Sequence, residues 1–396
     1  MKILVLHPSG AFGGASKSII SAQVEVGDSI DSVTVICPLG SSVSRFSSNG
    51  YTVRPVVGIS QFDNTRYGFY RKARWFILLR ELYYFFGSYR IVKSEVVSND
   101  FDLIHINEIT LLPWARIIKR WTSAPVLMHV RSLQREVASD WRTRFSFRLL
   151  SRDVDAIIAI DETVRASLPR ELPVTVIHNS LQVVDRKKGR ESASGPFRVA
   201  IIGVLLKLKG VYEFLEAVRI LVKERGLEIE FYIVGENARE LSGWKARILK
   251  LLDLAHDVED DIKRFIAVHS LEKNVVLTGF VEDVQNIYEN LDVLCFPSHL
   301  NAAGRPVFEA AFFGVPSIVA VKDPPPDTII DGETGICIDE PDGRLLADAI
   351  ERLFNNRDEL EYLGANAQEL AKKNFSIEKN SQALLQVYRD LVSKNN

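Results

Sequence analysis

The chain has 396 residues, of which 46% are hydrophobic and 25% charged, close to the average of soluble globular proteins, which excludes a disordered or fibrous class. The length exceeds what one hydrophobic core usually supports, so two domains are expected. No apolar run reaches the ~18 residues that span a bilayer, and the amino-terminal stretch is too short for a secretory leader, so we expect a cytoplasmic protein. Three scattered cysteines, Cys37, Cys295 and Cys337, predict neither a disulfide framework nor a zinc site.

Charge is divided unevenly between the two halves of the chain. Residues 1–195 carry 26 Lys and Arg against 18 Asp and Glu, a net charge of +8, and the remainder carries 23 against 33, a net charge of −10. A basic half favours an anionic partner, such as a phosphorylated substrate or a membrane surface. A chance imbalance on solvated faces explains the same numbers equally well.

Short apolar runs alternate with longer segments of helical period throughout the chain. In the first half, strands are predicted at 3–7, 33–37, 52–56, 103–107, 126–130, 156–160 and 174–178. In the second half, they are predicted at 198–203, 229–235, 274–280, 292–298, 316–320 and 335–339. The alternation predicts an α/β protein with two doubly wound parallel sheets, followed by amphipathic helices from Asp342 onward.

The two halves are joined by a polar stretch, "LQVVDRKKGRESASGP" at 181–196, whose charged and small residues are typical of a linker. We expect a first domain at 1–185, a linker at 186–196 and a second domain at 197–375. The last helix, 376–396, is expected to pack back on the first domain.

Ligands of doubly wound sheets bind at the carboxyl ends of strands, where loops lead into helices. The first such loop, "HPSGAFGGAS" at 7–16, has three glycines before a helix predicted to begin near Ala15, where free N–H groups attract phosphate. It does not match the dinucleotide-binding fingerprint. Taken alone, it is equally typical of a plain turn.

Two loops of the second half carry charged candidates. In "IIGVLLKLKG", 201–210, Lys209 precedes a glycine and a helix, so its ammonium group either binds an anion or is an ordinary solvated charge. In "NAAGRPVFEA", 301–310, Pro306 suits the first helical position, which predicts that Glu309 lies in the first turn. There its carboxylate either accepts two ligand hydroxyls or interacts with the helix dipole.

The order and spacing of these loops resemble the retaining glycosyltransferases of family 4, which have the glycosyltransferase-B fold of two facing Rossmann-like domains. The resemblance covers essentially the whole chain. The stretches that carry it are "GGAS", "FDLIHIN", "VIHNS", "GVLLKLKG", "VVLTGFVEDVQNIYENLDVLCFPS", "GRPVFEAAFFGVPSIVA" and "DTIIDGETG". It implies a second domain that binds the nucleotide sugar and a first domain on the acceptor side.

Such enzymes take a sugar from a nucleotide-diphosphate sugar, keep its anomeric configuration and need no metal ion or other cofactor. The resemblance implies that Glu309 holds the ribose hydroxyls and that Lys209 neutralises the diphosphate. Asp327 matches a family Glu near the sugar and is one methylene shorter. The resemblance implies further donor-binding positions at Gly13, Gly14, Gly203, Lys207, Gly304 and Arg305.

Two departures from the family pattern are visible. Asn301 stands where a Glu is common, and an amide carries no charge, so sugar recognition is expected to differ. Val204 stands where an Arg is common, so that either Lys207 or Arg305 substitutes for it or the activity is reduced.

The resemblance also places catalytic candidates in the first domain. The crevice-facing His of the family aligns with Arg131, and His129 lies on the same face of that strand. Either side chain is a candidate for contact with donor or acceptor, although His129 is equally explained as a packed strand residue. With Asn301, they form the catalytic set.

The segment least typical of the family, 65–93, holds seven basic residues, one acidic residue and ten aromatic residues, and 141–152 adds four arginines. This mixture predicts contact with an anionic membrane or a lipid-linked acceptor. The alternative is a helix whose aromatic residues fill the core and whose arginines are solvated. Nucleic acid is not expected, because no binding motif accompanies the charge.

These features predict a glycosyltransferase of surface polysaccharide or glycolipid synthesis at the inner face of the membrane. Two alternatives remain: a weakened relative that only binds a nucleotide sugar, and a sugar-nucleotide epimerase on the same fold. The pair Asp153 and Asp155 superficially matches a metal-binding Asp-x-Asp motif. It precedes the strand at 156–160, away from the crevice, and we interpret it as a solvated strand start.

Overall fold

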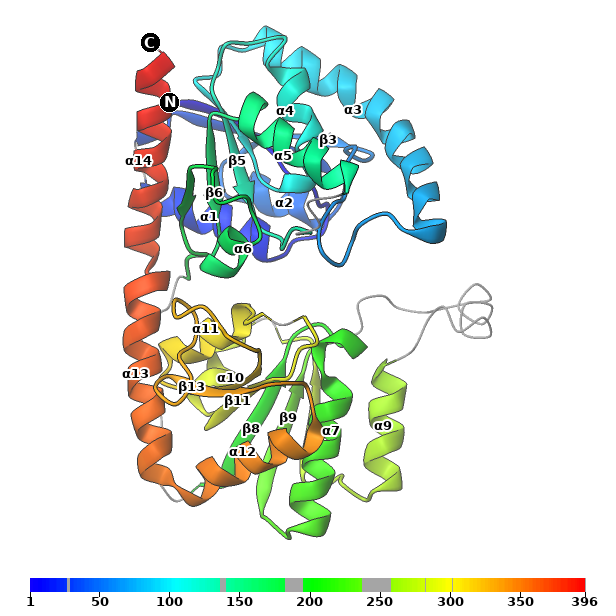
Figure 1. The fold of residues 1–396 in the computed structure, drawn as a ribbon, viewed down its shortest axis with the longest axis vertical. Coiled ribbons are helices and arrows are strands. Elements are labelled where there is room, and N and C mark those ends of the chain that lie inside the picture. Colours follow the sequence, from blue (N-terminus) through cyan, green and yellow to red (C-terminus); the bar gives the residue numbers. More distant parts are fainter. Residues whose placement is uncertain are drawn as a thin grey trace. The chain divides into compact units, whose positions relative to one another are not determined.

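The protein is described by a computed structural model that covers residues 1–26, 29–135, 140–181, 195–236, 258–281, 283–300 and 302–395. It divides into two compact units (Figure 1). Unit 1 comprises Met1–Gln182 and Phe375–Asn396, and unit 2 comprises Val183–Asn374. Among the described residues, no helix is both long enough and apolar enough to cross a membrane.

Unit 1 is built on a seven-stranded parallel sheet with the order β3-β2-β1-β4-β5-β6-β7. The direction in which strands are added reverses between β1 and β4, which makes the carboxyl edge at that point the expected ligand site. The strands are β1 (Lys2–Leu6), β2 (Ser32–Pro38), β3 (Thr52–Val56), β4 (Leu103–Ile106), β5 (Val126–Val130), β6 (Ala156–Ala159) and β7 (Val174–Val176).

Helices cover both faces of this sheet because successive strand residues point to opposite sides. Along β1, Ile3 and Val5 join one buried cluster, whereas Leu4 and Leu6 join the other. The first cluster lies under α1 (Gly14–Val26), α2 (Ser41–Ser48) and α14 (Ile377–Asn395). The second lies under α3 (Ile77–Ser98), α4 (Pro113–Ile118), α5 (Trp141–Asp153) and α6 (Glu162–Ala166), with the 3₁₀ turns η2 (Lys72–Phe76) and η3 (Ile109–Leu111) nearby.

The last helix belongs to unit 1, although the helix before it belongs to unit 2. Leu384, Tyr388 and Leu391 of α14 are buried in the same cluster as α1 and the sheet. The hydroxyl of Tyr388 lies 2.7 Å from Nδ1 of His105 on β4. The final residues of the chain therefore complete the core that its first residues begin.

Unit 2 repeats the architecture with a six-stranded parallel sheet in the order β10-β9-β8-β11-β12-β13. One face is covered by α7 (Val211–Arg219), η5 (Ile220–Glu224), α9 (Val258–Val268) and α12 (Gly343–Asn355), and the other by α10 (Gln285–Glu289) and α11 (Arg305–Phe312). Helix α13 (Arg357–Phe375) follows α12. The strands are β8 (Phe197–Ile202), β9 (Ile229–Val234), β10 (Val275–Gly279), β11 (Val293–Phe296), β12 (Ser317–Ala320) and β13 (Gly335–Ile338).

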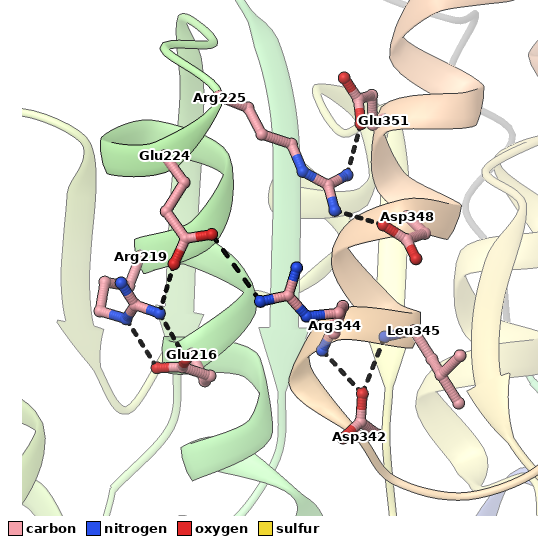
Figure 2. A network of polar contacts seen from close by, with 9 residues as sticks. All are labelled: Glu216, Arg219, Glu224, Arg225, Asp342, Arg344, Leu345, Asp348 and Glu351. Carbon is pink, nitrogen blue, oxygen red and sulfur yellow. Dashed lines mark hydrogen bonds and ion pairs between the residues drawn. The ribbon is translucent and has the colours of Figure 1, made fainter.

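A polar network joins α12 to α7 and η5 on the face of the sheet opposite α11 (Figure 2). Glu224 accepts from Arg219 at 2.8 Å and lies 3.9 Å from Arg344. Arg225 bonds both carboxylates that α12 presents to it, those of Asp348 and Glu351. Figure 2 also shows the side chain of Asp342 capping α12 at the backbone N–H groups of Arg344 and Leu345. These contacts hold the helix layer of unit 2 together at its surface.

Candidate functional site

In unit 2, the direction of strand addition reverses between β8 and β11, so the edge formed by their carboxyl ends, here called the crevice, is the expected ligand site. The loop after β8 begins at Gly203 and leads through the 3₁₀ turn η4 (Lys207–Lys209) into α7. The loop after β11 leads into α11, which begins at Arg305. The sequence-predicted donor residues of this unit follow β8, β11 and β12, and Asn301 lies outside the described residues.

The loop after β8 is held against the loop after β11. The backbone N–H of His299 and the hydroxyl of Ser298 both donate to the carbonyl of Leu208, at 3.1 and 3.2 Å. Gly210, at φ 78°, comes so close that a Cβ there would lie 1.8 Å from the carbonyl oxygen of Pro297. Only glycine fits both the backbone angle and the space, so the position of Lys209, one residue earlier, is well defined.

Lys209 is the most informative side chain of the crevice. Its Nζ lies 5.2 Å from the centre of the Phe296 ring, and burial lowers the pKa of its ammonium group. Within the described ranges, no carboxylate pairs with it. A partly buried cation without a counter-charge favours an anionic ligand, because desolvation is otherwise uncompensated. Lys207, by contrast, is exposed.

The start of α11 packs against the same Phe296 ring that Lys209 approaches. A Cβ on Gly304 would lie 2.4 Å from Cζ of that ring, so glycine lets the helix start approach closely. Arg305 donates from Nε to Oε1 of Glu309 at 2.6 Å, and its Nη1 is buried with no partner among the described residues. An unused buried guanidinium donor is a second feature that suits an anion.

Glu309 is placed differently from the sequence-based expectation. Helix α11 begins at Arg305, Pro306 is its second residue and Glu309 its fifth, so the carboxylate lies in the second turn and not in the first. Oε2 accepts a hydrogen bond from the hydroxyl of Tyr288 at 2.9 Å, while Oε1 accepts from Arg305. Each oxygen keeps one lone pair with which to accept a ligand hydroxyl.

Tyr288 is a residue that sequence reasoning missed. It is buried on α10 and stacks on Phe313, with ring centres 5.8 Å apart and an interplanar angle of 18°. Burial and the charge of Glu309 raise the pKa of Tyr288 well above its usual range, so the phenol keeps its proton and donates it to that carboxylate. The only signal in the sequence is an apolar-looking position at helical spacing, which does not reveal the partner.

Asp327 and Gly203 follow the two strands that lie on either side of β11. Asp327 follows β12, and its backbone carbonyl accepts from Nδ2 of Asn374 at 2.8 Å. Gly203 adopts φ 144° at the end of β8, and its carbonyl oxygen would lie 1.9 Å from a Cβ on Gly235 at the end of β9. Val204, where the resemblance leads us to expect an arginine, is exposed.

In unit 1, Arg131 follows β5 and is held by protein groups. Its Nε donates to Oδ1 of Asn107 at 2.8 Å and its Nη1 to Oδ1 of Asn179 at 2.7 Å. Because Oδ1 of Asn107 is an acceptor, its amide nitrogen donates to Nδ1 of His7, 2.8 Å away. The guanidinium group thus ties the ends of β1, β4 and β5 together.

His129 is a buried strand residue. Its ring stacks on that of His105, with centres 5.4 Å apart, and its Nδ1 accepts from Nη2 of Arg131 at 3.2 Å. Burial, and then the nearby Arg131 charge, lower the pKa of His7 and of His105 to about 3, and hold the pKa of His129 well below its usual range. All three imidazoles are therefore neutral at physiological pH.

The glycine loop of unit 1 separates into a packed part and an open part. A Cβ on Gly10 would lie 2.2 Å from the carbonyl oxygen of Leu39, so this glycine is required by packing. Gly13 is exposed and has open space where a Cβ would stand, and the exposed Gly14 begins α1. The two glycines predicted to approach a diphosphate thus lie at an accessible helix start.

The Asp-x-Asp pair has structural partners. Asp155 accepts from the backbone N–H of Val126 at 2.7 Å and pairs with Lys119 at 2.6 Å. Asp153 lies 3.7 Å from Arg116. These carboxylates connect α4 and α5 to the amino ends of strands.

Two family models match the chain in succession. Residues 12–183 match glycosyltransferase family 4, and residues 185–370 match the glycosyl transferases group 1. Among solved structures, HepE of Anabaena in complex with UDP covers 98% of this chain and 100% of its own with a TM-score of 0.75, at 19% identity. Sucrose-phosphate synthase of Thermosynechococcus elongatus covers 99% of both chains with a TM-score of 0.67, at 17% identity. These likenesses confirm the predicted fold class, the glycosyltransferase-B fold with carboxyl-terminal helices.

Curated relatives match over shorter stretches. The capsular polysaccharide biosynthesis glycosyltransferase CapM of Staphylococcus aureus is 26% identical over 237 residues, 56% of this chain and 57% of the relative. A D-inositol 3-phosphate glycosyltransferase of Corynebacterium kroppenstedtii is 29% identical over 198 residues, 50% of this chain and 41% of the relative. The chain thus spans about half the length of these relatives.

The buried histidines predict how the stability of unit 1 depends on pH. The folded state keeps the pKa of His7 and His105 near 3, whereas the unfolded chain takes up a proton near pH 6.5. The free energy of unfolding should therefore fall by about 1.4 kcal/mol per pH unit for each of them as the pH drops below 6.5. Urea unfolding followed by tryptophan fluorescence reports mainly on unit 1, which holds four of the five tryptophans.

The matched control is a histidine of unit 2 whose ring is only partly buried. His105→Gln should flatten the pH dependence of the urea midpoint, whereas His269→Gln should leave it unchanged. Equal pH dependence in the parent chain and the His105→Gln variant would contradict the assignment of a buried, neutral imidazole.

Proposed function

The chain belongs to the glycosyltransferases, with a family 4 domain followed by a group 1 domain, and we propose that it transfers a sugar from a nucleotide-diphosphate sugar to a glycan or lipid-linked acceptor. The acceptor class is suggested by CapM, a glycosyltransferase of capsular polysaccharide biosynthesis. Binding of the donor is suggested by HepE, whose structures contain UDP and UDP-glucose. Surface polysaccharide synthesis is the setting that fits both.

The observation that carries the proposal is the partly buried ammonium group of Lys209, at the point where the strand order of unit 2 reverses, with no carboxylate paired to it among the described residues. A diphosphate bound there meets this cation, the unused Nη1 of Arg305 and the start of α11 behind Gly304. Glu309, held by Arg305 and Tyr288, is positioned to accept the ribose hydroxyls. These groups suit a nucleoside diphosphate better than a neutral sugar.

In the proposed reaction, the bond between the anomeric carbon and the diphosphate oxygen breaks as the acceptor hydroxyl attacks the same face of the sugar. Attack on that face retains the anomeric configuration. The proton of the hydroxyl passes to the departing diphosphate oxygen, and no protein nucleophile takes part. Lys209 and Arg305 stabilise the negative charge that develops on the leaving group. We therefore propose a metal-independent enzyme, because these cations supply the neutralisation.

A second candidate function is that of a relative that binds a nucleotide sugar but turns it over poorly. It is favoured by the exposed Val204 at the end of β8, where the resemblance leads us to expect an arginine. Lys209 and an Arg305 that is already paired with Glu309 bring less positive charge to the diphosphate than they would with a further arginine at this position. The two functions share the binding site and differ in turnover.

Turnover is tested by incubating the full chain with a panel of nucleotide sugars, with and without lipid-linked acceptors and in the presence of a chelator. We expect release of a nucleoside diphosphate from one donor, increased by an acceptor and unaffected by the chelator. Binding without release would favour the second function. An isomerised nucleotide sugar would indicate an epimerase, and loss of release with the chelator would contradict metal independence.

Glu309→Ala tests the ribose assignment. Removal of the carboxylate should weaken the affinity for the matching nucleoside diphosphate about tenfold or more, because a charge-assisted hydrogen bond to the ligand is lost. The parent chain should also prefer this ligand to its 2′-deoxy analogue in a calorimetric titration, and the variant should show no such preference. If the variant still discriminates between the two ligands, Glu309 only supports Arg305 and Tyr288.

A further inference from the structure

Helix α3 has two apolar faces, and only one of them is packed. Val92 and Val96 are buried in the core of unit 1, and Phe85 and Tyr89 are partly buried against it. On another side of the helix, Leu79 is 67% exposed and Phe86 66% exposed. Leu82 and Tyr83 lie on that outer face as well, since residues three and four apart share a helix side. The aromatic residues of this segment are therefore divided between core and surface.

Basic side chains lie on the same outer face and on the neighbouring helix α5. Arg90 and Lys93 are exposed one and two turns further along the same side of α3. On α5, Arg144, Arg148 and Arg152 are exposed at helical spacing beside Trp141 and Phe145, which are exposed as well. None of these five cations pairs with a carboxylate in the part of the chain that the structure describes.

The exposed residues of α3 and those of α5 belong to one layer of helices. Helices α3, α4 and α5 pack on the same side of the sheet of unit 1, where Figure 1 shows them together. Phe85 of α3 stacks near Trp114 of α4 at 5.5 Å, and α4 packs on α5. In η2, just before α3, the Trp75 ring lies 5.2 Å from the guanidinium group of Arg142 on α5. The exposed side of this helix layer thus carries both apolar and basic side chains.

We propose that this surface docks unit 1 on a membrane of anionic phospholipids. We call it the cationic-apolar face, and its members are Trp75, Phe76, Leu79, Leu82, Tyr83, Phe86, Arg90, Lys93, Trp141, Arg144, Phe145, Arg148 and Arg152. Leucine and phenylalanine side chains enter the boundary between headgroups and acyl chains, while arginine and lysine side chains contact lipid phosphates. The helix lies in the plane of the interface and does not cross it.

Charge complementarity selects this partner over two others. A second copy of the chain would bring like charges on this face together, which is unfavourable. A nucleic acid would use the arginines but would leave Leu79, Leu82 and Phe86 in water, since a phosphate backbone offers no apolar surface. A bilayer with negatively charged headgroups satisfies both the apolar and the basic members of the face.

The test measures sedimentation of the full chain with lipid vesicles, with no nucleotide sugar present, so that its outcome is independent of turnover. We expect binding to vesicles of equal parts phosphatidylcholine and phosphatidylglycerol, little binding to phosphatidylcholine alone, and release at about 0.5 M salt. Arg148→Gln with Arg152→Gln should lower the partition coefficient about thirtyfold, and Leu79→Ser with Phe86→Ser about tenfold or more.

Matched controls place the same changes on unit 2. Val268→Ser with Phe280→Ser replaces apolar residues of similar exposure, 71% and 69%, and Lys273→Gln with Lys372→Gln removes two exposed cations. Both control pairs should bind vesicles like the parent chain. Equal binding to neutral and anionic vesicles, or equal losses in the face and control variants, would overturn the proposal. If the parent chain does not bind vesicles and is instead a dimer that the face variants convert to monomers, the face contacts a second copy of the chain.

Discussion

The crevice of unit 2 depends on one electrostatic constraint: a lysine ammonium group is partly buried against an aromatic ring and has no carboxylate beside it in the described chain. Gly210 and Gly304 create this arrangement, because each lets a loop approach the end of β11 more closely than any other residue would. The fold therefore holds a cation where desolvation is unfavourable unless an anion arrives. Arg305, with one buried donor unused, extends the same positive site toward the start of α11.

In unit 1, the cation at the equivalent edge of the sheet is already bonded by protein groups. This cation, Arg131, is bonded by Asn107, Asn179 and His129. The neighbouring imidazoles remain neutral because burial, and then the charge of Arg131, lower their pKa values. Its carboxyl edge is therefore a rigid, internally bonded structure, further held by Tyr388 of the returning last helix. In the described parts of the chain, unit 2 thus presents a cation without a paired carboxylate, whereas unit 1 presents open glycines at a helix start and an outer face with basic and apolar side chains.

Fold class could be predicted from the sequence because strand periodicity is a local property, and each apolar run that predicted a strand forms one. The placement of Glu309 was predicted less well: it lies in the second helical turn, since α11 begins at Arg305 and not at Pro306. Tyr288 could not be found, because its hydrogen bond to Glu309 depends on the packing of α10 beside α11. The aromatic residues of the segment at 65–93 divide between a packed face and an exposed face of α3, and periodicity alone could not assign each residue to core or surface.

Chemical labelling of Lys209 tests the central claim most directly. Burial lowers the pKa of its ammonium group, so the amine should react readily with an acylating reagent, and labelling at each lysine can be followed by mass spectrometry. We expect one of UDP, GDP, ADP and TDP to protect Lys209 strongly while leaving the exposed Lys273 unprotected. Labelling of Lys209 that no nucleoside diphosphate slows, under conditions where one of them binds the chain, would contradict the assignment of this lysine to the diphosphate.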